Sequence, residues 1–186
     1  ADEEGITFTL EDNQALKGVS RRKSLELLLK GESRCEEQMQ DMMERKNTYY
    51  LDSLHDLSPD NLLPGVAQFL DRAKTMNLRL GLGSASKNAR FVCERLQILK
   101  LFDVISDGTT VVNPKAAADL FIWVAGGFGL NPNACIVFED AEAGIQAARQ
   151  GGFWSVGVGQ HESLHEAHQI IAGFESVEPQ RFLSAD

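Results

Sequence analysis

The chain has 186 residues, and 18 basic against 27 acidic side chains give it a formal charge of −9. This length suits one medium-sized core or one core with a small appended domain, and the acidity disfavours nucleic acid or an anionic membrane as a partner. Three cysteines without a Cys-x-x-Cys spacing, and no apolar stretch long enough to span a bilayer, lead us to expect a cytoplasmic protein without disulfides or a thiolate zinc site.

The first part of the chain, to about residue 57, predicts a small helical bundle. Its residues are mostly charged or polar, and apolar side chains recur among them at helical spacing. We therefore expect a helical domain over residues 1–57 and a second domain over residues 58–186. The recurring apolar positions are Leu25, Leu28, Leu29, Met39, Met42 and Met43.

From residue 61 onward, helix and strand signals alternate. Repeated βα units of this kind predict an α/β fold with a parallel sheet. The expected helices cover residues 64–76, 88–99, 117–127 and 143–150, and the expected strands cover residues 78–83, 102–105, 135–138 and 154–158.

One expected strand ends in two adjacent carboxylates, Glu139 and Asp140. A strand buried on both faces has little use for acids, so this pair is expected at the carboxyl edge of the sheet, where open α/β folds bind ligands. Such carboxylates can supply oxygen ligands to octahedral magnesium. The alternative is that they cap the helix that follows.

Two further positions are candidates for holding a phosphoryl group. Ser84 lies just past a strand end, where its hydroxyl and the following N–H groups can donate to phosphoryl oxygens. A serine that only caps a helix or closes a turn is an equally good interpretation. Lys115 lies between an expected strand and helix, where an ammonium can neutralise a carboxylate nucleophile and a phosphoryl group, or can simply be solvated.

Taken together, these motifs resemble the β-phosphoglucomutase branch of the haloacid dehalogenase superfamily over nearly the whole chain. The resemblance implies a doubly wound parallel sheet with a small helical cap over residues 1–57. One departure is that Lys115 precedes three alanines, where the family usually has prolines. The matching motifs are Gly18-Val19-Ser20-Arg21, Arg45-Lys46-Asn47, Leu63-Pro64-Gly65, Ser84-Ala85-Ser86-Lys87-Asn88, Lys115 and Glu139-Asp140-Ala141-Glu142-Ala143-Gly144-Ile145.

The resemblance also implies an activity, a cofactor and a substrate class. The expected reaction interconverts β-glucose 1-phosphate and glucose 6-phosphate through a phosphoaspartate, with Mg²⁺ as cofactor held by the acid pair. A magnesium-dependent phosphatase of small phosphorylated molecules is the alternative. Cap and core residues are expected to face each other and grip the sugar phosphate, namely Arg21, Lys46 and Asn47 in the cap and Ser86, Lys87 and Asn88 in the core.

The resembling enzymes carry a nucleophilic aspartate, and a second aspartate two residues later, at the end of their first strand. Neither has a counterpart in residues 1–186, and about 25 residues of a complete first βα unit are lacking, so the cap is expected to be incomplete at its start. We therefore expect this chain alone not to turn over, and two strand edges to lie open for another segment or chain. A non-catalytic phosphosugar-binding remnant is the remaining alternative.

Two other motifs match short patterns of different chemistry, and neither is the favoured interpretation. His161-Glu162-Ser163-Leu164-His165 matches the H-E-x-x-H pattern of zinc hydrolases, with His168 one turn further on. This polar segment follows the last expected strand, and we interpret it as a solvated helix. Gly81-Leu82-Gly83 can open a dinucleotide-binding fingerprint, but Ser86 occupies the third glycine position.

Overall fold

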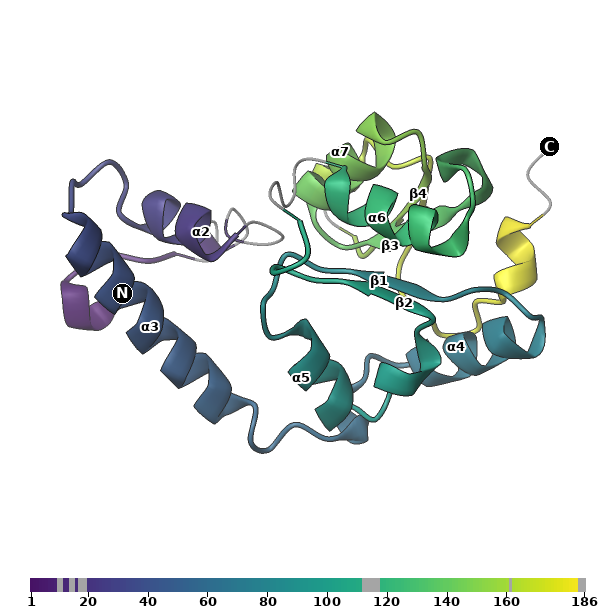
Figure 1. Cartoon of the computed structure of the whole chain (residues 1–186), viewed down its shortest axis with the longest axis horizontal. Helices are drawn as coiled ribbons and strands as arrows, with labels where there is room; N and C mark the ends of the chain where they lie inside the picture. The colour runs from purple at the N-terminus through teal and green to yellow at the C-terminus, as the bar shows by residue number, and fades with distance from the viewer. Residues whose placement is uncertain (10–11, 14–15, 17–19, 112–117, 161, 184–186) are drawn as a thin grey trace.

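A computed structural model of the chain describes residues 1–9, 12–13, 16, 20–111, 118–160 and 162–183. Two helices, α2 (Arg21–Leu28) and α3 (Glu36–Ser53), stand beside an α/β part that begins with α4 (Val66–Thr75), as Figure 1 shows. No helix in these described ranges is both long and apolar enough to cross a membrane.

The two helices of the cap pack through the apolar positions that the sequence predicts. Ser20 caps α2, because its hydroxyl accepts a hydrogen bond from the Lys23 N–H at 3.3 Å. Arg22 of α2 pairs with Glu36 at the start of α3, which ties the two helices together at the surface. The expected apolar positions are confirmed as one cluster, which consists of Leu25, Leu28, Leu29, Met39, Met42 and Met43 together with Ile6.

The α/β part is a doubly wound parallel fold, as expected. Helices α6 and α7 lie on one side of the strands in Figure 1, and α4 and α5 lie on the other. All strand pairs are parallel. The elements are β1 (Gly81–Gly83), α5 (Ala89–Arg95), β2 (Val104–Ser106), α6 (Asp119–Phe128), β3 (Ile136–Glu139), α7 (Glu142–Gln150), β4 (Trp154–Val158) and β5 (Gln169–Ile171).

The strands form two separate ladders. In the first, β1 pairs with β2, with Gly81 opposite Val104, and in the second the strand order is β3-β4-β5, with Ile136 opposite Trp154. One helical layer covers both ladders, since α6 contacts β1 and β2, α7 contacts β3 and β4, and the two helices contact each other. The shared cluster beneath them consists of Phe121, Ala125, Ala147, Ala148 and Phe153, with Cys135 and Val137 packed against it.

The opposite face of the second ladder is covered by α4 and by the C-terminal segment. Phe69 of α4 packs edge-on against Phe138 of β3, with ring centroids 5.3 Å apart, and it also contacts Phe174 and Phe182. These aromatic rings form a second core with Val156 of β4, which is fully buried.

The expected strand over residues 78–83 is longer than the observed β1, and the reason is local. The carboxylate of Asp103 accepts the Leu80 N–H at 2.8 Å, while the Asp103 N–H donates to the Leu80 carbonyl oxygen at 2.8 Å. A side chain therefore takes the place of a backbone rung there. The helix expected over residues 88–99 likewise ends at Arg95, and Gln97 follows with a φ of 58°.

The solvated helix predicted after the fourth expected strand is wrong. Residues Glu162–Leu164 form a single 3-10 turn, and the chain then adds β5 to the edge of β4. The physical reason is burial, because Leu164 is 0% exposed and Ile171 lies in the aromatic core. His161 of the H-E-x-x-H motif lies outside the described residues.

Candidate functional site

The loop over residues 84–88 leaves β1 at its carboxyl end and leads into α5. The Ser84 hydroxyl accepts a hydrogen bond from the Ser86 N–H at 3.2 Å, and the Ser86 hydroxyl accepts one from the Asn88 N–H at 3.1 Å. These are the turn contacts that the alternative interpretation of Ser84 predicts. A hydroxyl that accepts one bond still has its own proton to donate, so both serines keep a donor for a ligand.

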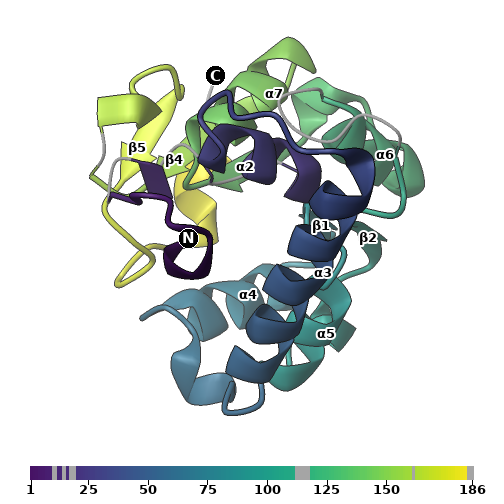
Figure 2. The same ribbon diagram turned by 90° about the vertical axis from the view of Figure 1, so that its left-hand side faces the viewer.

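The cap meets this loop at the amide of Asn47. Its Oδ1 accepts a hydrogen bond from Arg21 Nη2 at 2.7 Å and another from Asn88 Nδ2 at 2.9 Å. All three side chains are half-buried. Seen from the cap side, α3 passes in front of β1 and β2 (Figure 2). The structure thus joins three of the predicted site residues across the boundary between cap and core.

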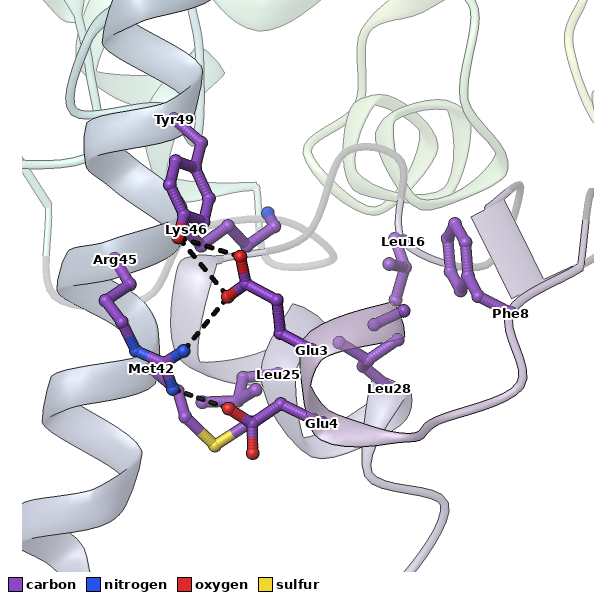
Figure 3. A pocket seen from close by; sticks show the side chains of 11 residues that line it. Glu3, Glu4, Phe8, Leu16, Leu25, Leu28, Met42, Arg45, Lys46 and Tyr49 are labelled. Carbon is purple, nitrogen blue, oxygen red and sulfur yellow. Dashed lines mark hydrogen bonds and ion pairs between the residues drawn. The ribbon is translucent and has the colours of Figure 1, made fainter.

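Lys46, the neighbour of Asn47 on α3, lines a hollow of about 200 Å³ within the cap (Figure 3). The floor of this hollow is apolar, and at its rim Arg45 pairs with Glu4 and Glu3 while the Tyr49 hydroxyl donates to Glu3 at 3.0 Å. The pKa of Lys46 is lowered, mainly because its ammonium is partly removed from water and also because the Arg21 charge lies nearby. Two cations held close together in this way favour an anion beside them.

The acid pair lies at the end of β3, on the other ladder. Glu139 is the last residue of the strand and half-buried, and Asp140 beside it is exposed. The Glu139 carboxyl group lies over Gly144 of α7, where a Cβ would come within 2.2 Å of the Glu139 Cδ. A side chain at this position would displace the Glu139 carboxyl group, so the glycine of the Ala143-Gly144 motif leaves room for it.

The remaining predicted residues are placed less fully. Lys87 is exposed on the 84–88 loop, and Lys115 lies outside the described residues. Gly81 and Gly83 pack against α6: a Cβ would meet Val124 at Gly81 and Phe121 at Gly83.

Sequence reasoning missed a buried acid behind the loop. Asp107 directly follows β2, is 4% exposed, and forms an ion pair with Arg90 of α5 at 3.3 Å. Burial opposes its ionisation, but hydrogen bonds from Thr109 and Thr110 and the charge of Arg90 outweigh it, so the pKa of Asp107 is lowered. The signal available in the sequence was the run Asp107-Gly108-Thr109-Thr110 after a strand, which is typical of a side-chain-stabilised turn.

The sequence profile of the haloacid dehalogenase-like hydrolases matches residues 1–152. The chain belongs to this family. A β-phosphoglucomutase of Bacillus subtilis is 37% identical over 175 residues, which cover 92% of this chain and 77% of that protein. The chain therefore belongs to the β-phosphoglucomutase-like branch of the haloacid dehalogenase family.

Further comparisons agree with this assignment. The crystal structure of a β-phosphoglucomutase from Clostridium difficile superposes with a TM-score of 0.92 at 35% identity, covering 98% of this chain and 83% of the other. A phosphorylated carbohydrates phosphatase of Thermotoga maritima is 25% identical over 173 residues, which cover 92% of this chain and 78% of the relative. Mutases and phosphatases thus both occur among its relatives. The chain shares its haloacid dehalogenase fold with enzymes that act on phosphorylated sugars.

Proposed function

We propose that this haloacid dehalogenase protein, once a further segment supplies the catalytic aspartates, interconverts β-glucose 1-phosphate and glucose 6-phosphate through a phosphoaspartate. The observation that carries the proposal is the contact at Asn47, where Arg21 of the cap and Asn88 of the core share one acceptor oxygen. Donors that converge from two layers suit a phosphate bound between them, and closure of the layers excludes water from it.

In this proposal residues 1–57 form the cap domain and residues 58–186 the core domain. The Arg21 guanidinium can hold two phosphate oxygens at once, which fixes the orientation of the sugar. Lys46 adds a second positive charge beside it. The proposed substrate-binding residues are Arg21, Lys46, Asn47, Ser86, Lys87 and Asn88, with Ser84 and Lys115 at the transferred phosphoryl group.

Mg²⁺ is the proposed cofactor. Magnesium is commonly held by one or two carboxylates, with water and phosphate oxygens in its other positions. Glu139 and Asp140 provide such a pair at a strand end, and among the described residues no third His, Cys, Asp or Glu joins them. The two carboxylates fit the ion, which when bound would neutralise phosphoryl charge.

The nucleophile is proposed to come from a segment outside residues 1–186, either in the same reading frame or in another chain. Asp107, which follows β2, is unsuited to attack phosphorus, because its carboxylate is buried and already accepts bonds from Thr109 and Thr110. In the proposed transfer, a sugar hydroxyl oxygen bonds to phosphorus as the aspartate oxygen leaves, and the hydroxyl proton passes to a second carboxylate.

The same outside segment is proposed to form a strand between β1 and β3. Support comes from the two ladders, since among the described residues each of these strands pairs on one side only, while one helical layer covers both ladders. All residues of β3 are only half-buried although three are large and apolar, whereas Ser155, Val156 and Gly157 of the neighbouring β4 are buried. A strand paired with both open edges would bury the apolar surface of β3.

Turnover of β-glucose 1-phosphate to glucose 6-phosphate, with Mg²⁺ and a bisphosphate primer, tests this proposal. Residues 1–186 and a chain extended by the residues encoded directly upstream are compared, and a Gly/Ser-rich extension of equal length is the control. We expect turnover, and slower hydrogen exchange in β1 and β3, only with the encoded extension. Robust turnover by residues 1–186 of verified intact mass would contradict the outside nucleophile.

The alternative is a magnesium-dependent phosphatase, favoured by the phosphatase relative. The two activities differ in whether water or a second sugar hydroxyl attacks the phosphoaspartate. Free phosphate released faster than glucose 6-phosphate is formed would favour the phosphatase. Failure of both the extended chain and residues 1–186 to bind glucose 6-phosphate would reject a phosphosugar function altogether.

A further inference from the structure

A second layer of contacts lies directly behind the 84–88 loop and is centred on Asp107. One carboxylate oxygen, Oδ1, accepts hydrogen bonds from the Thr109 N–H at 2.9 Å, the Thr109 hydroxyl at 2.6 Å and the Thr110 hydroxyl at 3.2 Å. The other, Oδ2, lies 3.3 Å from Nε of Arg90. Both oxygens of this buried carboxylate therefore have partners, Oδ1 within its own turn and Oδ2 on α5.

These contacts clamp the loop from both ends. Arg90 is the second residue of α5, so its ion pair with Asp107 fixes the helix into which the loop leads. On the other side, the Ser84 N–H donates to the Ser106 carbonyl oxygen at 2.9 Å, and the Gly108 N–H donates to the Ser86 carbonyl oxygen at 3.2 Å. The segment around Asp107 thus holds the loop at Ser84, at Ser86 and at the start of α5.

The approach of the two segments is close enough to require a glycine. A Cβ at residue 108 would lie 2.4 Å from the Ala85 carbonyl oxygen and 2.9 Å from the Lys87 backbone nitrogen. Such distances are far below van der Waals contact, so the backbone of the loop and the backbone of the turn fit against each other without side chains between them. A small shift of the turn would therefore move the loop.

We infer that Asp107 is a positioning residue, which acts through Arg90 and the backbone of its own turn to fix the direction of the Ser86 and Asn88 donors. The ion pair joins a buried carboxylate to an exposed guanidinium, so its role here is argued from geometry and not from stability. This inference rests on the proposed function only for the identity of the ligand that the loop binds. The ordering of the loop by Asp107 can be measured without any ligand.

The chain supplies a matched control at the other end of the same strand. Asp103 precedes β2, pairs with Lys74 at 2.8 Å and accepts the Leu80 N–H at 2.8 Å. It therefore combines an ion pair with a backbone contact, as Asp107 does, but at the edge of the sheet away from the loop. Asp103→Asn and Asp107→Asn remove the same charge from the two ends of β2.

Hydrogen exchange of the peptide covering residues 84–90, followed by mass spectrometry without ligand, tests the inference. The amides of Ser84, Ser86 and Asn88 are all hydrogen-bonded, so their exchange reports the order of the loop. We expect Asp107→Asn and Arg90→Gln to accelerate it about tenfold or more, Arg90→Lys to restore most of the protection, and Asp103→Asn to leave it unchanged. If Asp107→Asn does not fold, Arg90→Gln decides, since Arg90 is exposed.

Calorimetry with glucose 6-phosphate on the same variants provides the second measurement. We expect Asp107→Asn to weaken binding about tenfold or more, because donors on a disordered loop must first be ordered before they can hold the ligand. Equal exchange in the loop for Asp107→Asn, Asp103→Asn and the unchanged chain would overturn the inference. Absence of binding to both the unchanged chain and the extended chain would instead reject the proposed function, and the exchange data would still decide the role of Asp107.

Discussion

Removal of the Asn47 amide is expected to weaken the contact between cap and core and, with it, the binding of a sugar phosphate. In the structure, Oδ1 of Asn47 accepts bonds from Arg21 at 2.7 Å and from Asn88 at 2.9 Å. Asn47→Ala deletes the shared acceptor and leaves a cationic donor and a neutral donor without this partner. The backbone of α3 is unaffected, since alanine is a good helix former.

The magnitude follows from the two bonds. A hydrogen bond to a charged group contributes about 1.5–3 kcal/mol, and a neutral one contributes about 0.5–1.5 kcal/mol. Arg21 and Asn88 are half-buried, so water replaces part of what is lost. We expect a net loss of about 1–3 kcal/mol, which corresponds to a factor of about 5 to 150 in an equilibrium constant.

Titration calorimetry with glucose 6-phosphate and Mg²⁺ measures this loss as a change in Kd. The matched control is Gln40→Ala, which removes a 2.6 Å bond between Gln40 and Glu44 on the exposed side of the same helix. Its Kd should equal that of the unchanged chain. If Asn47→Ala and Gln40→Ala have the same Kd, the contact at Asn47 does not belong to a phosphosugar site.

Three further predictions concern stability and metal binding. Leu164→Ala should lower the free energy of unfolding by about 2–5 kcal/mol in urea titrations, since Leu164 is 0% exposed, whereas Leu63→Ala, at a side chain 67% exposed, should change it by less than about 0.5 kcal/mol. The pKa of Asp103, through its bond from Lys74, and the pKa of Asp107 are both lowered in the fold, so the two ionised carboxylates stabilise it above a pH of about 4. This contribution is lost as the pH falls through the lowered pKa values. The double variant Asp103→Asn/Asp107→Asn should therefore lose less stability on acidification, as measured by circular dichroism. Mg²⁺ should raise the Tm in the presence of phosphate, and Asp140→Asn should abolish that rise in scanning calorimetry.

Most of the fold could be predicted because its signals are local. The six apolar cap positions follow helical spacing, and β4 runs over the expected residues Trp154–Val158. The failure at β5 has a physical reason. Only three residues pair with β4, and His168, just before β5, fixes its approach by accepting the Ser155 N–H at 3.1 Å. A strand this short depends on tertiary contacts that no periodic pattern records.

The candidate site could be predicted from the sequence where a polar or charged side chain directly follows an expected strand. Polar residues directly after strands, such as Ser84 and Asp140, predict a binding site, because ligands of open α/β folds bind at the carboxyl ends of the strands. That Asn47 accepts from both Arg21 and Asn88 could not be read from the chain, since the three residues come from separate segments. Asp107 was missed for the opposite reason, because a short Asp-Gly run after a strand is so common in turns that it carries no special signal.

The shared acceptor at Asn47 also bears on how a ligand would be received. A carbonyl oxygen has two lone pairs, and Arg21 and Asn88 occupy both. A phosphate group brings several acceptor oxygens, which can accept from the remaining N–H groups of Arg21 and Asn88 while Asn47 keeps both of its bonds. Because the two donors already point to one place before binding, little of their side-chain freedom remains to be lost when the ligand enters. In the proposed function, the contact between cap and core thereby preorganises both donors for a phosphate.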